Sequence, residues 1–210
     1  MKIGIITREI QTTDVAVNGI PITYLNVIKQ YGTAIFIDNS IDLKANHDYI
    51  KSQINEVDSF IIPGGDTINN VDLYIIDHCY KNDIPLLGIC LGMQEIAYYF
   101  DQKGLTPIGD LSHFDMKAKY LHEIKLVENG YLYKLLNTKS IYVNSRHKFK
   151  IKENRNYTVE AISDTVIEAI KVKNKKYILG LQFHPEIMYP YDNNAKIIFD
   201  DFMNVKKTSS

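Results

Sequence analysis

The first hundred residues alternate between short apolar runs and longer segments whose apolar residues recur at helical spacing. The apolar runs predict buried strands at Lys2–Thr7, Thr33–Asp38, Ser59–Ile62 and Ile84–Ile89. The segments between and after them predict helices at Ile20–Lys29, Leu43–Val57, Ile68–Tyr80 and Met93–Phe100. The polar segment Arg8–Asn18 has no clear period, and no element is expected there. This alternation is typical of parallel βαβ units, in which ligands bind at the carboxyl ends of the strands.

The second half of the chain changes character, beginning with the polar–apolar alternation of a half-exposed strand. Strands are expected at Leu121–Val127, Ser140–Val143, Tyr157–Ile162, Thr165–Val172 and Tyr177–Phe183. A short helical turn is expected at Gly130–Leu136, a turn at Asn174, and a closing helix from Asp192 to about Val205. No internal repeat, low-complexity segment or linker interrupts the pattern, so we expect one domain covering residues 1–210.

Composition and charge exclude several classes of protein. The formal net charge is −1 at pH 7, which gives no global basic field for nucleic acid. No apolar run approaches the length of a membrane span, and the first apolar run is too short for a signal peptide. Two cysteines do not make a disulfide framework. We therefore expect a cytoplasmic protein with neither nucleic-acid nor membrane partners.

Cys90 lies where an expected buried strand, Ile84–Ile89, meets an expected helix, Met93–Phe100. Gly88 and Gly92 flank it at two residues on either side, which is the spacing of a nucleophile elbow with sulfur in place of oxygen. The glycines are needed because side chains there would collide with the neighbouring strand or helix. The positive end of the helix favours a thiolate. A buried, inert cysteine is the alternative, and the glycine spacing favours the nucleophile.

A cysteine nucleophile needs a base, and the base needs an orienting group. His184 follows the expected strand Tyr177–Phe183, and Pro185 fixes the chain direction so that Glu186 can lie beside the imidazole. A surface loop that happens to hold both residues is the alternative. Together with the elbow, the pair indicates a catalytic triad.

Two glycines, Gly64 and Gly65, follow the strand Ser59–Ile62. They let backbone N–H groups point into a shared cavity, as an oxyanion hole requires. A turn without a function explains the tetrapeptide Pro63–Asp66 equally well when it is taken alone.

Taken together, the motifs Pro63–Asp66, Gly88–Gln94 and Gln182–Glu186 resemble those of the class I (triad) glutamine amidotransferase superfamily, in the same order and with roughly the same spacing. The second half resembles the peptidase C26-like branch that contains γ-glutamyl hydrolases and γ-glutamyl-γ-aminobutyrate hydrolases. The stretches that carry this finer resemblance are His122–Ile124, Val143–His147 and Val166–Ile170.

The resemblance implies a flavodoxin-like three-layer α/β sandwich around a mostly parallel central sheet. It implies a triad of Cys90, His184 and Glu186, and an oxyanion hole formed by the N–H groups of Gly65 and Leu91. It also implies a substrate site beside the triad, and we expect no cofactor. The residues expected to line that site are Gly64, Gln94, Asn144, Ser145 and His147.

Three departures from the branch concern the pocket for the leaving group. The first loop is reduced to about Arg8–Asn18, Arg146 precedes His147, and His113–Asp115 replaces a polar segment that faces substrate in the branch. Because of these departures, the sequence does not identify the amine that leaves.

Metal ligation is an alternative role for His113, Asp115, His122 and Glu123. No pair has the tight helical spacing of a zinc site, and His122 and Glu123 should face opposite sides of a strand. We therefore expect no metal site.

The expected function is hydrolysis of a small γ-glutamyl amide through a γ-glutamyl thioester, releasing glutamate and an amine. One alternative is a glutaminase subunit that supplies ammonia to a synthetase partner. A second is a non-catalytic binding protein with the same fold. The sequence leaves homo-oligomer formation open.

Overall fold

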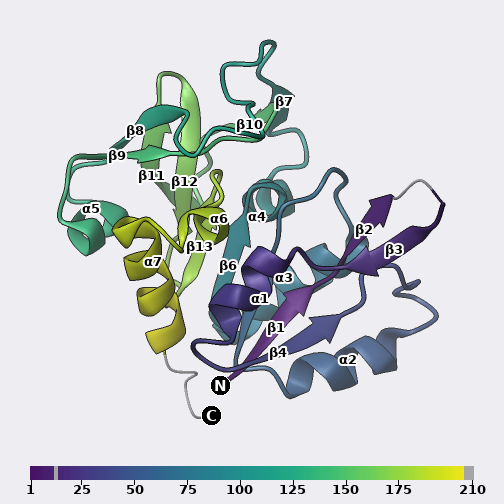
Figure 1. Cartoon of the computed structure of the whole chain (residues 1–210). Helices are drawn as coiled ribbons and strands as arrows, with labels where there is room; N and C mark the ends of the chain where they lie inside the picture. The colour runs from purple at the N-terminus through teal and green to yellow at the C-terminus, as the bar shows by residue number, and fades with distance from the viewer. Residues whose placement is uncertain (12–13, 206–210) are drawn as a thin grey trace.

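The computed structural model describes residues 1–11 and 14–205 of the chain (Figure 1). Within these residues a nine-stranded sheet has the order β4-β1-β5-β6-β13-β12-β11-β8-β9. Five strands run parallel to one another: β4 (Thr33–Ile37), β1 (Lys2–Ile6), β5 (Ser59–Ile62), β6 (Leu86–Ile89) and β13 (Ile178–Leu181). The rest continue antiparallel from β13: β12 (Val166–Val172), β11 (Tyr157–Ser163), β8 (His122–Leu126) and β9 (Ser140–Val143).

Helices cover both faces of the sheet (Figure 1). One face packs against α2 (His47–Asn55), α3 (Asn70–Asn82) and α4 (Leu91–Phe100), and the other against α1 (Ile22–Ile28), α5 (Tyr131–Leu136) and α7 (Asn193–Asn204). Strand β5 explains the division, because Phe60 and Ile62 point into one core and Ile61 into the other. The short helix α6 (Pro185–Met188) lies between β13 and α7. This arrangement confirms the expected flavodoxin-like three-layer sandwich.

Most element boundaries differ from the sequence expectation by one to four residues. Helix α4 begins two residues earlier than expected, directly after Cys90. Helix α2 is shorter than expected. Asp192 caps α7 as expected, accepting a hydrogen bond from the Ala195 N–H at 2.9 Å. Asn174 has a positive φ of 58°, which suits the expected turn.

Two antiparallel pairs of strands outside the main sheet were not expected. Strands β2 (Arg8–Gln11) and β3 (Ala16–Gly19) pair antiparallel in the segment that has no clear period, part of which lies outside the described residues. Strands β7 (Leu105–Pro107) and β10 (Phe149–Ile151) pair across a long sequence separation. In β2 the charged Arg8 is buried, so the usual link between polarity and exposure is reversed there.

The topology brings three loops to one edge of the sheet. Strand β6 lies between β5 and β13, with Ile62 paired to Gly88 and Leu181 paired to Ile89. All three strands end at this edge, so Pro63, Cys90 and Phe183 emerge side by side. Among the described residues, no helix is long and apolar enough to span a membrane.

Candidate active site

Cys90 lies at the expected strand-to-helix elbow. Its φ of 54° and ψ of −104° are unusual for a residue with a side chain, and such strain recurs at functional sites. A Cβ on Gly88 would lie 2.6 Å from the Gly92 carbonyl carbon, and one on Gly92 would lie 2.2 Å from the Ile62 oxygen. Both glycines are therefore required by close backbone approach. Cys90 is 6% exposed at the start of α4, where the helix dipole is positive.

His184 and Glu186 form the expected pair. The His184 Nδ1 lies 2.8 Å from Glu186 Oε1; the Glu186 side chain is buried, and that of His184 is 12% exposed. A Cβ on Gly64 would lie 2.8 Å from His184 Cε1 and 3.4 Å from Cys90 Cβ, so the imidazole and the cysteine share this glycine as a neighbour. The structure thus brings the three expected triad residues together.

The charges around His184 favour its protonated form. Burial alone would lower the pKa of the imidazole, but the charges of Glu186 and of the Cys90 thiolate raise it to about 10. His184 is therefore a cation at neutral pH, between a carboxylate on Nδ1 and the sulfur of the elbow.

Asn144 holds the backbone of His184 from the end of β9. Its Oδ1 accepts a hydrogen bond from the His184 N–H at 2.8 Å, and its Nδ2 donates to the His184 carbonyl at 3.0 Å. Ser145 donates its hydroxyl proton to the carbonyl of His113 at 2.7 Å. Both side chains are fully buried, behind the residues that line the pocket.

The loop after β5 lies beside the elbow, as an oxyanion hole requires. A Cβ on Gly65 would lie 3.0 Å from Leu91 Cδ2, so Gly65 packs against the Leu91 side chain. Leu91 is the first residue of α4, and its N–H therefore has no partner within the helix. The preceding N–H, that of Gly64, is already used, because it donates to the hydroxyl oxygen of Tyr24 at 3.1 Å.

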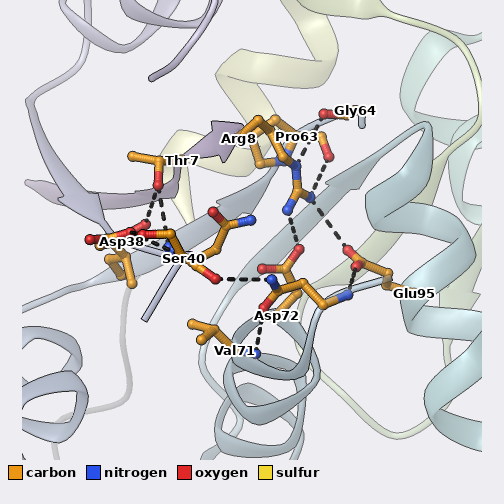
Figure 2. A network of polar contacts seen from close by, with 12 residues as sticks. Thr7, Arg8, Asp38, Ser40, Pro63, Gly64, Val71, Asp72 and Glu95 are labelled. Atoms are coloured by element: carbon orange, nitrogen blue, oxygen red, sulfur yellow. Dashed lines mark hydrogen bonds and ion pairs between the residues drawn. The ribbon is translucent and has the colours of Figure 1, made fainter. Parts of the chain in front are cut away.

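Arg8 fixes the same loop through its guanidinium group (Figure 2). Its guanidinium donates to the Gly64 carbonyl at 3.1 Å and to the Pro63 carbonyl at 2.8 Å. It also pairs with Asp72 and, at 3.4 Å, with Glu95. Burial and the neighbouring Asp72 raise the pKa of Glu95 well above its usual value. A buried charge network thus positions two carbonyls of the loop Pro63–Asp66. Because this loop is expected to form part of the oxyanion hole, it is called the oxyanion loop.

A pocket of about 170 Å³ opens over Cys90. It contains four residues expected to belong to the site: Cys90, Gly65, Gln94 and His147. Of the other lining residues, Phe114 and Arg146 belong to the departures that concern the leaving-group pocket, and Asp66 belongs to the Pro63–Asp66 motif. Lys148 and Phe149 were not expected there. Gln94 is held by its amide group, which donates to the Phe149 carbonyl at 3.3 Å and to Gln182 Oε1 at 3.2 Å.

Sequence reasoning missed Arg8 and Tyr24, since both lie far from the motifs along the chain. The one signal in the sequence for Arg8 was its place directly after the expected buried strand Lys2–Thr7, where a charged residue is rare.

Sequence reasoning also missed a second buried cluster, formed by His113, His147 and Glu168. In this cluster the nitrogen and oxygen atoms able to bind a metal ion lie within 4.8 Å of one another. The expectation of no metal weighed His113 and His122 by their spacing along the chain. The fold brings them to a carboxylate on another strand.

Known proteins of two kinds are similar to the chain. The model of the peptidase C26 family matches residues 69–186, more than half of the chain. The CTP synthase of Methanosphaera stadtmanae is 24% identical over 244 residues, covering 99% of this chain and 44% of the relative. The CTP synthase of Clostridium acetobutylicum is 24% identical over 250 residues, covering 99% and 45%. The chain therefore spans about half the length of these relatives.

Two solved structures have a similar fold. The glutaminase domain of Trypanosoma brucei CTPS with bound acivicin superposes with a TM-score of 0.72 at 16% identity, covering 99% of this chain and 95% of that chain. A glutamine amidotransferase from Thermotoga maritima gives a TM-score of 0.60 at 15% identity, covering 97% and 86%. At these identities the likeness establishes the fold alone.

Proposed function

Because the chain belongs to the peptidase C26 family and has the class I glutamine amidotransferase fold, we propose that it hydrolyses the γ-glutamyl amide bond of a small conjugate. The products are glutamate and the free amine. The observation that carries this proposal is the convergence of Cys90 on its strained elbow with the His184–Glu186 pair, at one edge of the sheet.

In the first half of the reaction, the Cys90 thiolate attacks the γ-carbonyl carbon of the substrate. The carbonyl oxygen becomes an oxyanion, which accepts hydrogen bonds from the N–H groups of Gly65 and Leu91. The tetrahedral intermediate collapses as the carbon–nitrogen bond breaks. Protonated His184 gives its proton to the leaving amine, and a γ-glutamyl thioester remains on Cys90. Glu186 orients the imidazole and stabilises its charged form.

In the second half, water attacks the thioester carbon and His184 takes its proton. The carbon–sulfur bond breaks, glutamate leaves, and Cys90 and His184 return to the ion pair. The raised pKa of His184, about 10, supports this assignment, because the imidazole then holds the proton that the amine needs.

The charges around the pocket suit a γ-glutamyl group, which carries an α-carboxylate and an α-ammonium. Arg146 and Lys148 offer cations for the carboxylate, and Asp66 offers an acid for the ammonium. Gln94 offers an amide from α4, and His147 lies in the same lining. Gly64 packs against His184, and Asn144 and Ser145 support the wall from behind.

A second candidate function is favoured by the curated relatives. They are named CTP synthases, and the chain matches less than half of their length. Under this alternative the protein is a glutaminase that supplies ammonia to a synthetase partner. The same triad serves both functions, so only the substrate and the effect of a partner distinguish them.

The experiment is a measurement of glutamate release from a panel of substituted γ-glutamyl amides and from glutamine, without a partner. We expect at least one substituted amide to have a higher kcat/KM than glutamine. Cys90→Ala should abolish release, and His184→Asn should lower kcat by at least about 100-fold. Cys79→Ala is the matched control, because Cys79 is a buried cysteine packed in the core away from the site.

Three outcomes would contradict the proposal. Glutamine as the best substrate, with hydrolysis raised many-fold by a separate protein, would establish the glutaminase alternative. Labelling of Cys79 rather than Cys90 by a glutamine-like electrophile would remove the nucleophile assignment. Absence of any adduct and of any turnover would indicate a binding protein that keeps only the fold.

A further inference from the structure

Three histidine side chains converge on one buried carboxylate beside the active-site pocket. Glu168 lies on β12, and its Oε1 is 3.0 Å from His113 Nδ1, 3.6 Å from His147 Nε2 and 3.7 Å from His122 Nε2. Glu168 is 0% exposed, and His113 and His147 are 4% and 3% exposed. The rings of His113 and His122 meet edge to face, with centroids 4.4 Å apart. Glu168 and His122 lie on the strands β12 and β8, whereas His113 and His147 lie in two loops.

The contact of His113 has the length of a hydrogen bond but not its alignment, and those of His147 and His122 are longer than a hydrogen bond. Among the described residues, none of the three nitrogen atoms nor either oxygen of Glu168 has a partner with hydrogen-bond geometry. Neighbouring ligands of a tetrahedral zinc ion lie about 3.3 Å apart and point at the ion rather than at each other. The separations around Glu168 Oε1 fit that description.

Partners on the far side of two rings support the same conclusion. The Phe149 carbonyl lies 3.0 Å from His147 Nδ1 and can only accept a hydrogen bond, so Nδ1 carries the proton. His147 Nε2, in the neutral ring, then turns a lone pair toward Glu168. His122 Nδ1 lies 3.0 Å from Ser163 Oγ, which places its Nε2 toward the same carboxylate. Such outer hydrogen bonds are typical of metal-binding histidines.

A buried carboxylate surrounded by lone pairs is costly unless a cation lies among them. A protonated histidine would relieve this by donating a straight hydrogen bond to the carboxylate, and no such bond is formed. A divalent ion would accept a lone pair from each nitrogen and from the carboxylate. We propose that His113, His147 and Glu168, with His122 as fourth ligand, form a binding site for a divalent transition-metal ion of the zinc type.

The position of the site indicates a structural role beside the pocket. The His147 N–H donates to the His113 carbonyl at 3.0 Å, and Phe114 forms a β-bridge with Arg146. Phe114, Arg146 and His147 all line the Cys90 pocket. The ion therefore ties to β12 both the loop that contains His113 and the segment between β9 and β10 that contains His147. Four protein ligands leave no open position, as in structural zinc sites.

The experiment is a titration of chelator-treated protein with zinc, followed by calorimetry and by the melting temperature. It uses a Cys90→Ala background, because the thiolate and imidazole of the active site could also bind zinc. We expect one zinc ion per chain and a higher melting temperature. Cobalt should give the visible spectrum of a tetrahedral site, without a sulfur-to-metal band.

Variants assign the ligands. Glu168→Gln and His113→Gln should lose binding, His122→Asn should weaken it at least tenfold, and Ser163→Ala should weaken it about 10-fold. His47→Gln is the matched control, because the His47 side chain is half exposed and far from the cluster in the fold. Each variant is checked for folding by circular dichroism.

The proposal fails if chelator-treated protein binds neither zinc nor cobalt, or if folded Ser163→Ala and His122→Asn variants bind as tightly as their parent. In the first case the cluster is a proton-sharing network. That result would appear as a melting temperature that changes with pH and is unaffected by metal. Neither result alters the assignment of Cys90, since activity is not the readout.

Discussion

The Cys90 pocket has a buried polar cluster on each side, and the two clusters balance charge differently. On the oxyanion side, Arg8 lies between two acids and two backbone carbonyls (Figure 2). Burial and Asp72 raise the pKa of Glu95, and the guanidinium of Arg8 opposes that shift. Both acids of this cluster thus face a cation that the chain itself supplies.

On the histidine side, one carboxylate faces three imidazole nitrogens, and none of them completes a hydrogen bond to it. This cluster reaches balance only with added protons or a cation. The oxyanion loop is therefore held by the chain's own charges, whereas the opposite wall depends on protons or a cation taken up from solution. Removing groups from each side tests that difference.

The largest expected effect is that of Arg8→Met. It leaves Asp72 and Glu95 buried without their cation, which should lower the free energy of unfolding by about 3–5 kcal/mol. It also removes the donors to the Pro63 and Gly64 carbonyls, so kcat should fall more than KM rises. Denaturant unfolding followed by circular dichroism measures the first effect, since the chain has no tryptophan.

The control for this change is Arg155→Met at an exposed position, which should alter stability by less than about 0.5 kcal/mol. Unchanged stability of Arg8→Met, in zinc-loaded and in chelator-treated protein alike, would show that the oxyanion side does not depend on its charges.

A smaller effect is expected from Asn144→Ala, which acts on the backbone of His184. It removes both hydrogen bonds to the His184 backbone and leaves a buried N–H and a buried carbonyl without partners, at a cost of about 2 kcal/mol. The exposed Asn26→Ala is the control. If Asn144 bound substrate directly, KM would rise with little change in stability; we expect kcat and stability to fall together.

The sequence predicts those parts of the site that are local. The Gly88–Gly92 elbow follows from one strand-to-helix junction, and the His184–Glu186 contact follows from two residues on either side of a proline. The rule that binding sites of parallel sheets lie at their carboxyl edge then predicts that the loop after β5 and the elbow after β6 meet at one edge.

The supports of the site could not be predicted in this way. Arg8 reaches Gly64 across 56 positions, and Ser145 reaches His113 across 32. Such contacts depend on how the sheet and its loops pack, which no local period records. The same reason hid the Glu168 cluster, because spacing along the chain does not show that three histidines meet on a carboxylate of another strand.

Replacing Glu186 tests what keeps the imidazole of His184 protonated. The pKa of His184 is raised to about 10, so its protonation stabilises the fold fully below about pH 6.5, and this contribution is lost as the pH rises to about 10. Glu186→Gln removes the nearest negative charge and should lower that pKa by at least one unit, about 1.4 kcal/mol. The measurement is an NMR titration of the imidazole, assigned with His184→Asn; an unchanged titration in Glu186→Gln would assign the raised pKa to Cys90 alone.

The smallest expected effect is that of Tyr24→Phe, which separates the two supports of the oxyanion loop. The hydroxyl of Tyr24 accepts one hydrogen bond, from the Gly64 N–H, whereas Arg8 holds two carbonyls and two acids. Loss of one hydrogen bond should lower stability by about 1 kcal/mol, and kcat should fall less than in Arg8→Met. Tyr142→Phe, at a side chain 60% exposed, is the control. A larger loss of kcat in Tyr24→Phe than in Arg8→Met would mean that the N–H of Gly64, rather than the carbonyls, sets the position of the loop. The charge network would then serve stability alone.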